Sequence, residues 1–126
     1  MAIRNPYEQI RQNQVFSTPP EELVLMLYDG AIRFIKKAKA GIEEKNIEVS
    51  HNNIVKTQNI ITELMSNLDM NLGISDNLFS LYEYINRRLV EANLKKDATI
   101  LEEILELIQD LRNTWEQAIK IAKQQT

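Results

Sequence analysis

Apolar residues recur along this chain in steps of three and four, the spacing that places side chains on one face of an α-helix. The pattern predicts four long helices, at about residues 20–44, 46–71, 76–95 and 97–124. Their apolar seams are Val24, Tyr28, Ala31, Ile35, Ala38 and Ile42; Ile47, Ile54, Ile61, Leu64 and Leu68; Leu78, Leu81, Tyr82, Ile85, Leu89 and Ala92; and Leu101, Ile104, Ile108, Leu111, Trp115, Ala118 and Ala122. Seams of this kind pack helices into bundles.

Helix-start signals divide the N-terminal part of the chain. Asn5 and Glu8 have the spacing of a capping box around Pro6, which predicts a short helix at about residues 5–15. Thr18 and Glu21 repeat that spacing before the first long helix. The short helix has too few apolar residues to be stable alone in water, so we expect it to dock on the rest of the molecule or to be mobile.

Glycines and acidic residues mark the later boundaries. Gly73 predicts the end of the helix at 46–71, Ser75 or Asp76 is expected to cap the next one, and the last helix is expected to begin near Asp97. The apolar period runs through Asp29-Gly30 without a break, although Asp-Gly is a strong turn signal. We therefore expect a continuous helix there. Gly30 is interpreted as a point of close helix packing, with a weak point for bending or partner contact as the alternative.

The predicted fold class is all-α. Four long helices with short connections favour an antiparallel up-down-up-down four-helix bundle with a short additional N-terminal helix. The length of 126 residues suits a single domain over residues 1–126. Only three glycines and three prolines occur, which is few for a fold built on many turns.

Composition narrows the class of protein. There is no cysteine, so disulfides, thiolate metal sites and thiol nucleophiles are excluded. No apolar run approaches the roughly 18 residues of a membrane span, and the start of the chain lacks the apolar stretch of a signal peptide. We therefore expect a cytoplasmic protein without membrane insertion. The net charge of −3, with both signs mixed, argues against nucleic-acid binding.

Candidate chemistry is sparse. Glu48 and His51 have the Glu-x-x-His spacing of di-iron bundles, but such sites need a second copy of the motif and the chain has a single histidine. Ser50 is adjacent to His51 on a helix, where neighbouring side chains point apart. The three glycines, Gly30, Gly41 and Gly73, are isolated from one another, so the chain has no glycine-rich loop that could bind phosphate. We expect no enzyme activity, no metal and no cofactor.

Several helices carry a second apolar stripe beside their seam. Leu25 with Ile32, and Ile100 with Leu107, are pairs of this kind. Two interpretations stay open at this point. The extra residues either widen the core and contact the short N-terminal helix, or they form a groove for an amphipathic partner helix.

Specific motifs point to a family. Asn5-Pro6-Tyr7-Glu8-Gln9, Gln14-Val15, Thr18-Pro19-Pro20-Glu21-Glu22-Leu23, Leu27-Tyr28-Asp29-Gly30-Ala31, Leu78-Phe79-Ser80-Leu81-Tyr82-Glu83-Tyr84, Leu89 with Ala92-Asn93, and Trp115 follow one another along the chain. In this order they resemble the flagellin export chaperone family, FliS, over essentially the whole chain. The C-terminal tail, ending at Thr126, is short compared with many members.

The resemblance implies a cytoplasmic chaperone that binds the C-terminal segment of flagellin, prevents its premature polymerisation and assists its delivery to the flagellar type III export gate. It implies no nucleotide. A monomer or weak dimer is expected without the client. The alternative is another helical secretion adaptor or a self-associating structural bundle. The predicted flagellin-binding residues are Tyr7, taken from the matched motif, and Ile10, Leu25, Ile32, Ile100 and Leu107, taken from stripe geometry.

Two further expectations follow for named residues. Tyr28 and Trp115 fall on seams, so we assign them to the core. The short N-terminal helix is expected to occupy part of the client groove when flagellin is absent, with Tyr7 and Ile10 as the side chains that fill it.

Overall fold

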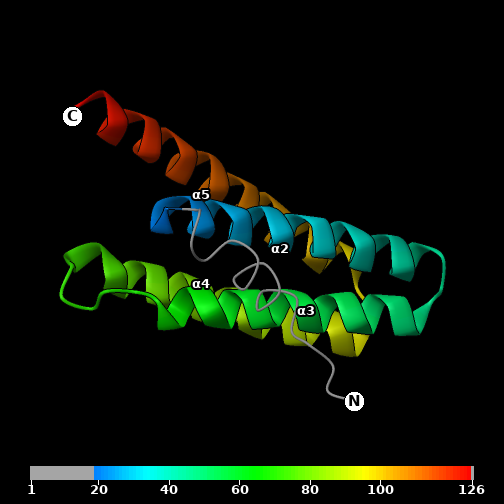
Figure 1. Ribbon diagram of the computed structural model, residues 1–126. Coiled ribbons are helices and arrows are strands. Elements are labelled where there is room, and N and C mark those ends of the chain that lie inside the picture. The colour runs from blue at the N-terminus through cyan, green and yellow to red at the C-terminus, as the bar shows by residue number, and fades with distance from the viewer. Residues whose placement is uncertain (1–18, 126) are drawn as a thin grey trace, which may run out of the picture.

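Four antiparallel helices make up the described part of the molecule. The computed structural model describes residues 19–125, which form α2 (Pro20–Glu43), α3 (Ile47–Ser66), α4 (Gly73–Lys95) and α5 (Ala98–Gln124). α2 borders α3 and α5, and α4 borders the same two helices, so the four close into a ring (Figure 1). The predicted all-α, up-down-up-down bundle is confirmed. The helix expected at residues 5–15 lies outside the described residues.

The core is built from the predicted seams. Every helix contributes at least one fully buried isoleucine from its seam, among them Ile35, Ile54, Ile85 and Ile104. Each such side chain contributes about 1.5–3 kcal/mol by leaving water. Small seam residues such as Ala31 and Ala92 are also fully buried. The prediction was wrong for Ile47, which is 67% exposed because it is the first residue of α3 and lies beyond the end of the packed interface.

Two of the helix starts are capped by side chains. Asn46 Oδ1 accepts a hydrogen bond of 3.1 Å from Val49 N at the start of α3. Asp97 Oδ1 accepts one of 2.9 Å from Thr99 N at the start of α5, as predicted from the sequence. At α2 the capping position is Pro19, which supplies no side-chain hydrogen bond. The start of α5 is therefore recognisable from the sequence, because aspartate is a preferred N-cap residue.

The α3–α4 connection differs from the prediction. α3 ends at Ser66, five residues before the expected limit, and α4 begins at Gly73. Gly73 was expected to stop the preceding helix and instead opens the next one. Leu72 occupies the capping position without a side-chain hydrogen bond. Ser75 does not cap α4, because its Oγ donates to the carbonyl oxygen of Asp69 over 2.6 Å and so ties the connection to the first turn.

Close packing of α2 on α3 depends on Gly41. A Cβ atom added to Gly41 would lie 2.8 Å from the backbone nitrogen of Ser50, a distance that such atoms do not adopt. α3 can therefore approach α2 only because this position lacks a side chain. Gly30, expected from the sequence to be a point of close packing, is buried within an unbroken α2. The expectation of a continuous helix through Asp29-Gly30 is confirmed.

Candidate functional site

The bundle is closed at one end and open at the other. Ile108 is the last buried residue of α5, although the helix continues to Gln124. Tyr82 is the first buried apolar residue of α4, although that helix begins at Gly73. We call the end that carries the first turns of α2 and α4 and the last turns of α3 and α5 the open end. Figure 1 shows α5 diverging from α4 there.

Polar contacts explain why α5 follows α2 and leaves α4. Arg112 Nε is 2.9 Å from Asp29 Oδ1, and Trp115 Nε1 donates to the carbonyl oxygen of Glu21 over 2.7 Å. Both contacts join the distal half of α5 to α2. A third joins Lys123 to Glu22 at 3.2 Å.

The contacts between α4 and α5 lie nearer the closed end. Glu103 accepts hydrogen bonds from Tyr84 Oη at 3.0 Å and from Arg88 Nε at 2.9 Å. The guanidinium of Arg88 beside it holds the pKa of the Glu103 carboxyl below its usual range. Both contacts go to Glu103, in the second turn of α5, and towards the open end the two helices separate.

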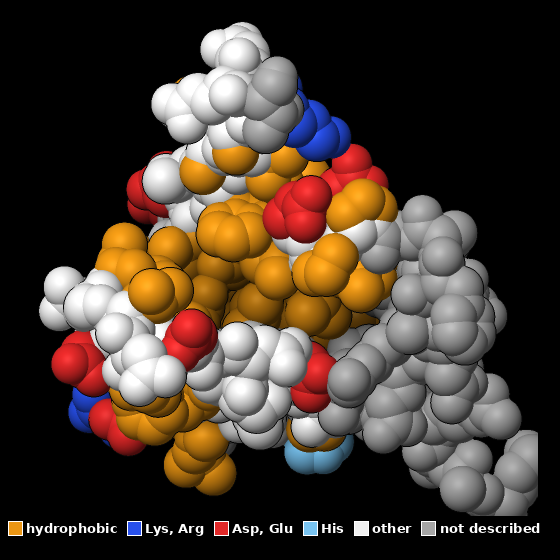
Figure 2. All heavy atoms as spheres, turned by 60° about the vertical axis from the view of Figure 1, so that its left-hand side comes forward, with side chains coloured by type: hydrophobic (Ala, Val, Ile, Leu, Met, Phe, Trp, Pro, Cys, Tyr) orange, Lys and Arg blue, Asp and Glu red, His pale blue; other side chains and the backbone are white. Residues whose placement is uncertain are grey.

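The separation leaves an apolar groove of about 570 Å³, which we call the open-end groove. All four described helices contribute to it. Its lining comprises Val24 and Tyr28 of α2; Leu64 of α3; Asn67, Leu68, Asp69 and Leu72 of the α3–α4 connection; Ile74, Ser75, Leu78, Leu81 and Tyr82 of α4; and Leu107, Asp110, Leu111, Thr114, Trp115 and Ala118 of α5. Figure 2 looks onto this end and shows a hollow floored by hydrophobic side chains.

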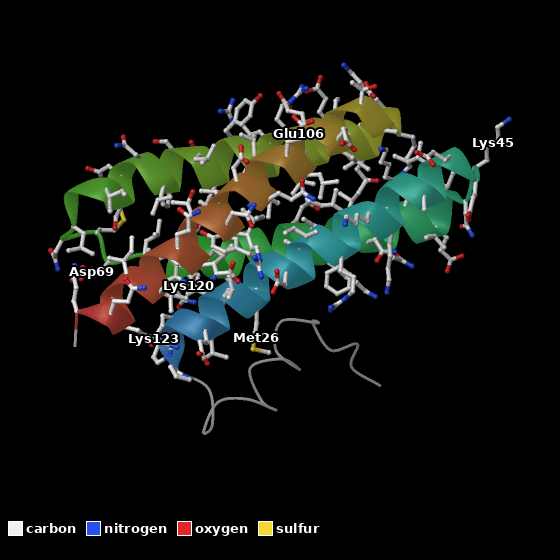
Figure 3. The ribbon with its side chains drawn as sticks, turned by 90° about the horizontal axis from the view of Figure 1, so that it is seen from above. Met26, Lys45, Asp69, Glu106, Lys120 and Lys123 are labelled. Carbon is white, nitrogen blue, oxygen red and sulfur yellow. The ribbon has the colours of Figure 1, made fainter. Side chains whose placement is uncertain are left out.

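The charge of the groove has one sign. Asp69 and Asp110 are the charged residues of its lining, and no lysine or arginine belongs to it. Asp69 lies at the open end, and Lys120 and Lys123 of α5 lie towards the same end of the bundle (Figure 3). The surface therefore suits an apolar side-chain row flanked by neutral or basic residues.

Exposed apolar side chains continue from the lining of the groove onto its rim. Leu72 and Ile74 of the lining are 56% and 63% exposed, and the neighbouring Met70, outside the lining, is 52% exposed. A smaller recess of about 330 Å³ lies between α2 and α5 and shares Trp115 and Ala118 with the open-end groove. An apolar path thus passes from the groove to the other side of α5. Exposed apolar surface of this extent is typical of a binding site for another chain.

Comparison with known proteins identifies the family. The model of the flagellar protein FliS matches residues 3–122. The chain belongs to the FliS family. The flagellar secretion chaperone FliS of Bacillus subtilis is 43% identical over 120 residues, which cover 95% of this chain and 90% of that protein. The FliS chaperone of Salmonella typhimurium is 35% identical over 115 residues, 88% of this chain and 85% of its own length.

The fold is shared with a solved structure. A crystal structure described as a flagellar chaperone from bacteria superposes with a TM-score of 0.76 and covers 91% of this chain and 95% of the other. Its sequence identity of 19% makes this a comparison of folds. The four-helix bundle that the seams predict is therefore also the fold of that solved structure.

The six predicted binding residues divide into four groups. Leu107 lines the open-end groove. Leu25 and Ile32 are half-buried on α2 and do not belong to the groove lining. Ile100 does not lie on an exposed stripe, because the first turns of α5 are enclosed by the closed end of the bundle and leave it 5% exposed. Tyr7 and Ile10 lie outside the described residues.

The two aromatic residues assigned to the core, Tyr28 and Trp115, differ from each other in how deeply they are buried. Tyr28 is buried at 3% exposure, as predicted, and forms part of the groove floor. Trp115 packs against the core but is only half-buried and lines both recesses, so it lies at the edge of the core and not within it. The reason is the divergence of α5, which removes the helix that would have covered this ring.

Most groove residues were missed because they are seam residues. Leu68, Leu78, Leu81 and Leu111 were assigned to the core; they pack against it while half-buried, and their exposed sides line the groove. One signal could have found them. The seam of the last helix extends well beyond the length of the helices expected to cover it, so some of its apolar residues had to lack a partner.

Catalytic features are not part of this site. His51 is exposed, and its Nδ1 lies 2.9 Å from Asn93 Nδ2. Within residues 19–125 there is no group of three or more histidine or carboxylate side chains that could hold a metal ion. None of α2 to α5 combines the length and apolar character that crossing a bilayer requires.

Proposed function

We propose that this chain binds the C-terminal segment of flagellin in the cytoplasm, keeps it from polymerising early and assists its delivery to the flagellar export gate. The single observation that carries the proposal is the open-end groove, a large apolar surface that the bundle does not cover. Membership of a family of flagellar secretion chaperones supports a secreted flagellar protein as the client. The proposal requires neither a catalytic residue nor a cofactor.

The groove suits a client of this type on physical grounds. The ends of flagellin pack as helices in the filament, so a free end exposes an apolar stripe. An amphipathic helix binds by laying such a stripe into a groove, with anchor residues spaced by three and four positions. Leu78 and Leu81 on one wall and Leu107 and Leu111 on the other present apolar side chains to the same hollow.

The second recess supports a client that continues beyond one helix. Because Trp115 and Ala118 line both recesses, a chain leaving the groove at Trp115 reaches further apolar surface around α5. A segment that is disordered when free gives up conformational entropy on ordering, so a large contact area is compatible with moderate affinity and with release. A chaperone that delivers its client to an export gate must both cover the client and release it.

The first test is co-purification with flagellin. The full-length chaperone is mixed with flagellin that carries or lacks its C-terminal segment, and the complex is measured by size-exclusion chromatography and calorimetry. We expect a complex with the intact protein and none with the truncated protein. Equal binding of both would contradict the proposal and favour another kind of helical adaptor.

The second test locates the binding surface. Leu78→Gln and Leu111→Gln place polar amides in the groove at half-buried positions, and each is expected to weaken flagellin binding about tenfold, which corresponds to about 1.4 kcal/mol. Val90→Gln is the matched control, because Val90 is a 47% exposed residue on the opposite face of α4. Weakening by Val90→Gln but not by Leu78→Gln would place the client elsewhere.

A further inference from the structure

The outward face of α4 carries a row of residues that neighbouring helices do not cover. It consists of Asp76, Phe79, Glu83, Arg87, Val90 and Leu94, which follow at steps of three and four and are all exposed. We call it the α4 outer stripe. Its apolar members are 37%, 47% and 82% exposed in chain order. A solvated helix face normally carries polar residues, so three large apolar side chains here require an explanation.

The stripe points away from the open-end groove. The buried side of α4 carries Tyr82, Ile85 and Leu89, and the stripe lies on the other side of the same helix. Within residues 19–125, α4 borders only α3 and α5. Figure 3 shows α4 along one edge of the bundle, with no described helix beyond it. A partner could therefore cover the stripe without entering the groove.

The central part of the stripe, from Phe79 to Val90, is close to symmetric in residue order. Glu83 and Arg87 lie at its centre, on either side of Ile85 in the sequence. Phe79 and Val90 flank them. If a second copy of α4 is laid antiparallel on the first about a two-fold axis near Ile85, Glu83 of each copy meets Arg87 of the other. Phe79 then approaches Val90 of the second copy, so these two apolar residues also pair, whereas Leu94 lies towards the end of the contact, opposite Asp76.

The two central charges are available for such a contact. Neither Glu83 nor Arg87 forms an ion pair within residues 19–125, and the Arg87 guanidinium lies over the Tyr84 ring at 5.8 Å. The next charged residues along the helix differ in this respect. Arg88 is paired with both Glu91 and Glu103. The stripe thus holds one acidic and one basic group that a second copy would satisfy together.

From this arrangement we infer that the α4 outer stripe is a self-association surface, through which two copies of the chain pair antiparallel about a two-fold axis. Such an interface is isologous, because the same residues are contributed by both copies. It is limited to one helical stripe of about 27 Å from each copy, so the dimer is weak and concentration-dependent. Both open-end grooves stay accessible, and the inference does not depend on the identity of the client.

Charge reversal provides the test, by sedimentation equilibrium of the full chain without flagellin. Glu83→Lys gives each copy two central positive charges, and Arg87→Glu gives each copy two negative charges. Each variant alone is expected to dimerise at least about tenfold more weakly than the unaltered chain. An equimolar mixture of the two variants is expected to regain association, as a heterodimer of one copy of each. Both positions are exposed, so circular dichroism should show the folded bundle in every sample.

Three results would overturn the inference. The unaltered chain could stay monomeric up to about 1 mM, above the range of weak specific dimers. The single variants could dimerise as well as the unaltered chain, or their mixture could fail to regain association. Flagellin binding is measured in parallel with the same variants and is expected to be unchanged. Loss of flagellin binding without a change in self-association would assign the stripe to the client instead.

Discussion

The hydroxyl oxygens of Tyr28 and Tyr82 lie 2.5 Å apart and join α2 to α4 across the middle of the bundle. These two helices do not border one another, so the pair is a link between opposite corners of the ring. Burial raises the pKa of both hydroxyls, and the neighbouring tyrosine raises the pKa of Tyr82 further. The link lies beneath the open-end groove, where the fully packed core begins.

Removing both hydroxyls of this pair should cost less than the sum of the costs of removing each one alone. Tyr28→Phe leaves the Tyr82 hydroxyl buried without its partner, which is expected to lower the free energy of unfolding by about 1–3 kcal/mol. The double variant Tyr28→Phe/Tyr82→Phe leaves no unpaired hydroxyl and should lose less than the sum of the two single losses. Denaturant unfolding of the four proteins gives the coupling directly. Additive losses would show that the hydrogen bond contributes nothing.

The same pair predicts a stability loss in alkali. A tyrosine in the unfolded chain ionises near pH 10. The folded pKa values of Tyr28 and Tyr82 are raised, so their contribution is complete below about pH 10 and is lost as the pH rises towards the folded values. The free energy of unfolding should therefore fall above about pH 10 less steeply in the double phenylalanine variant than in the unaltered chain. Parallel slopes would contradict this.

Gly41→Ala tests the close approach of α2 and α3. Its Cβ would lie 2.8 Å from Ser50 N, so the helices must move apart, at an expected cost of about 1–3 kcal/mol in the free energy of unfolding. Gly73→Ala is the matched control, since no atom lies within 4 Å of its added Cβ. That variant should be neutral or stabilised by up to about 1 kcal/mol, because alanine restricts the unfolded chain. Thermal unfolding distinguishes the two.

The N-terminal hypothesis predicts competition for the groove. If Tyr7 and Ile10 fill part of it when flagellin is absent, the variant Tyr7→Ala/Ile10→Ala should bind the flagellin segment more tightly, whereas weaker binding would assign both side chains to direct contact with flagellin. Deletion of residues 1–16 should act in the same direction. Calorimetry measures the affinity, and denaturant unfolding reports whether the bundle has changed. Unaltered affinity together with unaltered stability would contradict the hypothesis.

The fold could be predicted because it depends on local spacing. Ile35, Ile54, Ile85 and Ile104 were placed in the core from periodicity, and all are fully buried. The α3–α4 boundary was less predictable, because Gly73 is compatible with the end of one helix and the start of another. Leu72, the residue that precedes α4, carries no capping side chain that would have decided between them.

The groove could not be predicted because it depends on the angle between helices. That angle is set by contacts such as Arg112 with Asp29 and Trp115 with Glu21, which join residues far apart in the sequence. Periodicity also cannot tell which stripe of a helix is enclosed. Ile100 and Leu107 belong to one stripe, yet Ile100 lies in the closed end and Leu107 at the groove.

The unequal packing along the bundle has a consequence for local unfolding. Amide hydrogens near Ile54 and Ile104 sit in dense packing and should exchange with solvent only when the whole domain opens, whereas those in the last turns of α5 should exchange through small local openings. A ligand that inserts between the loosely packed turns can therefore reshape them while the slowly exchanging part keeps its structure. The part of the domain that can adapt to a ligand and the part that keeps the fold rigid therefore lie at different positions along the bundle axis.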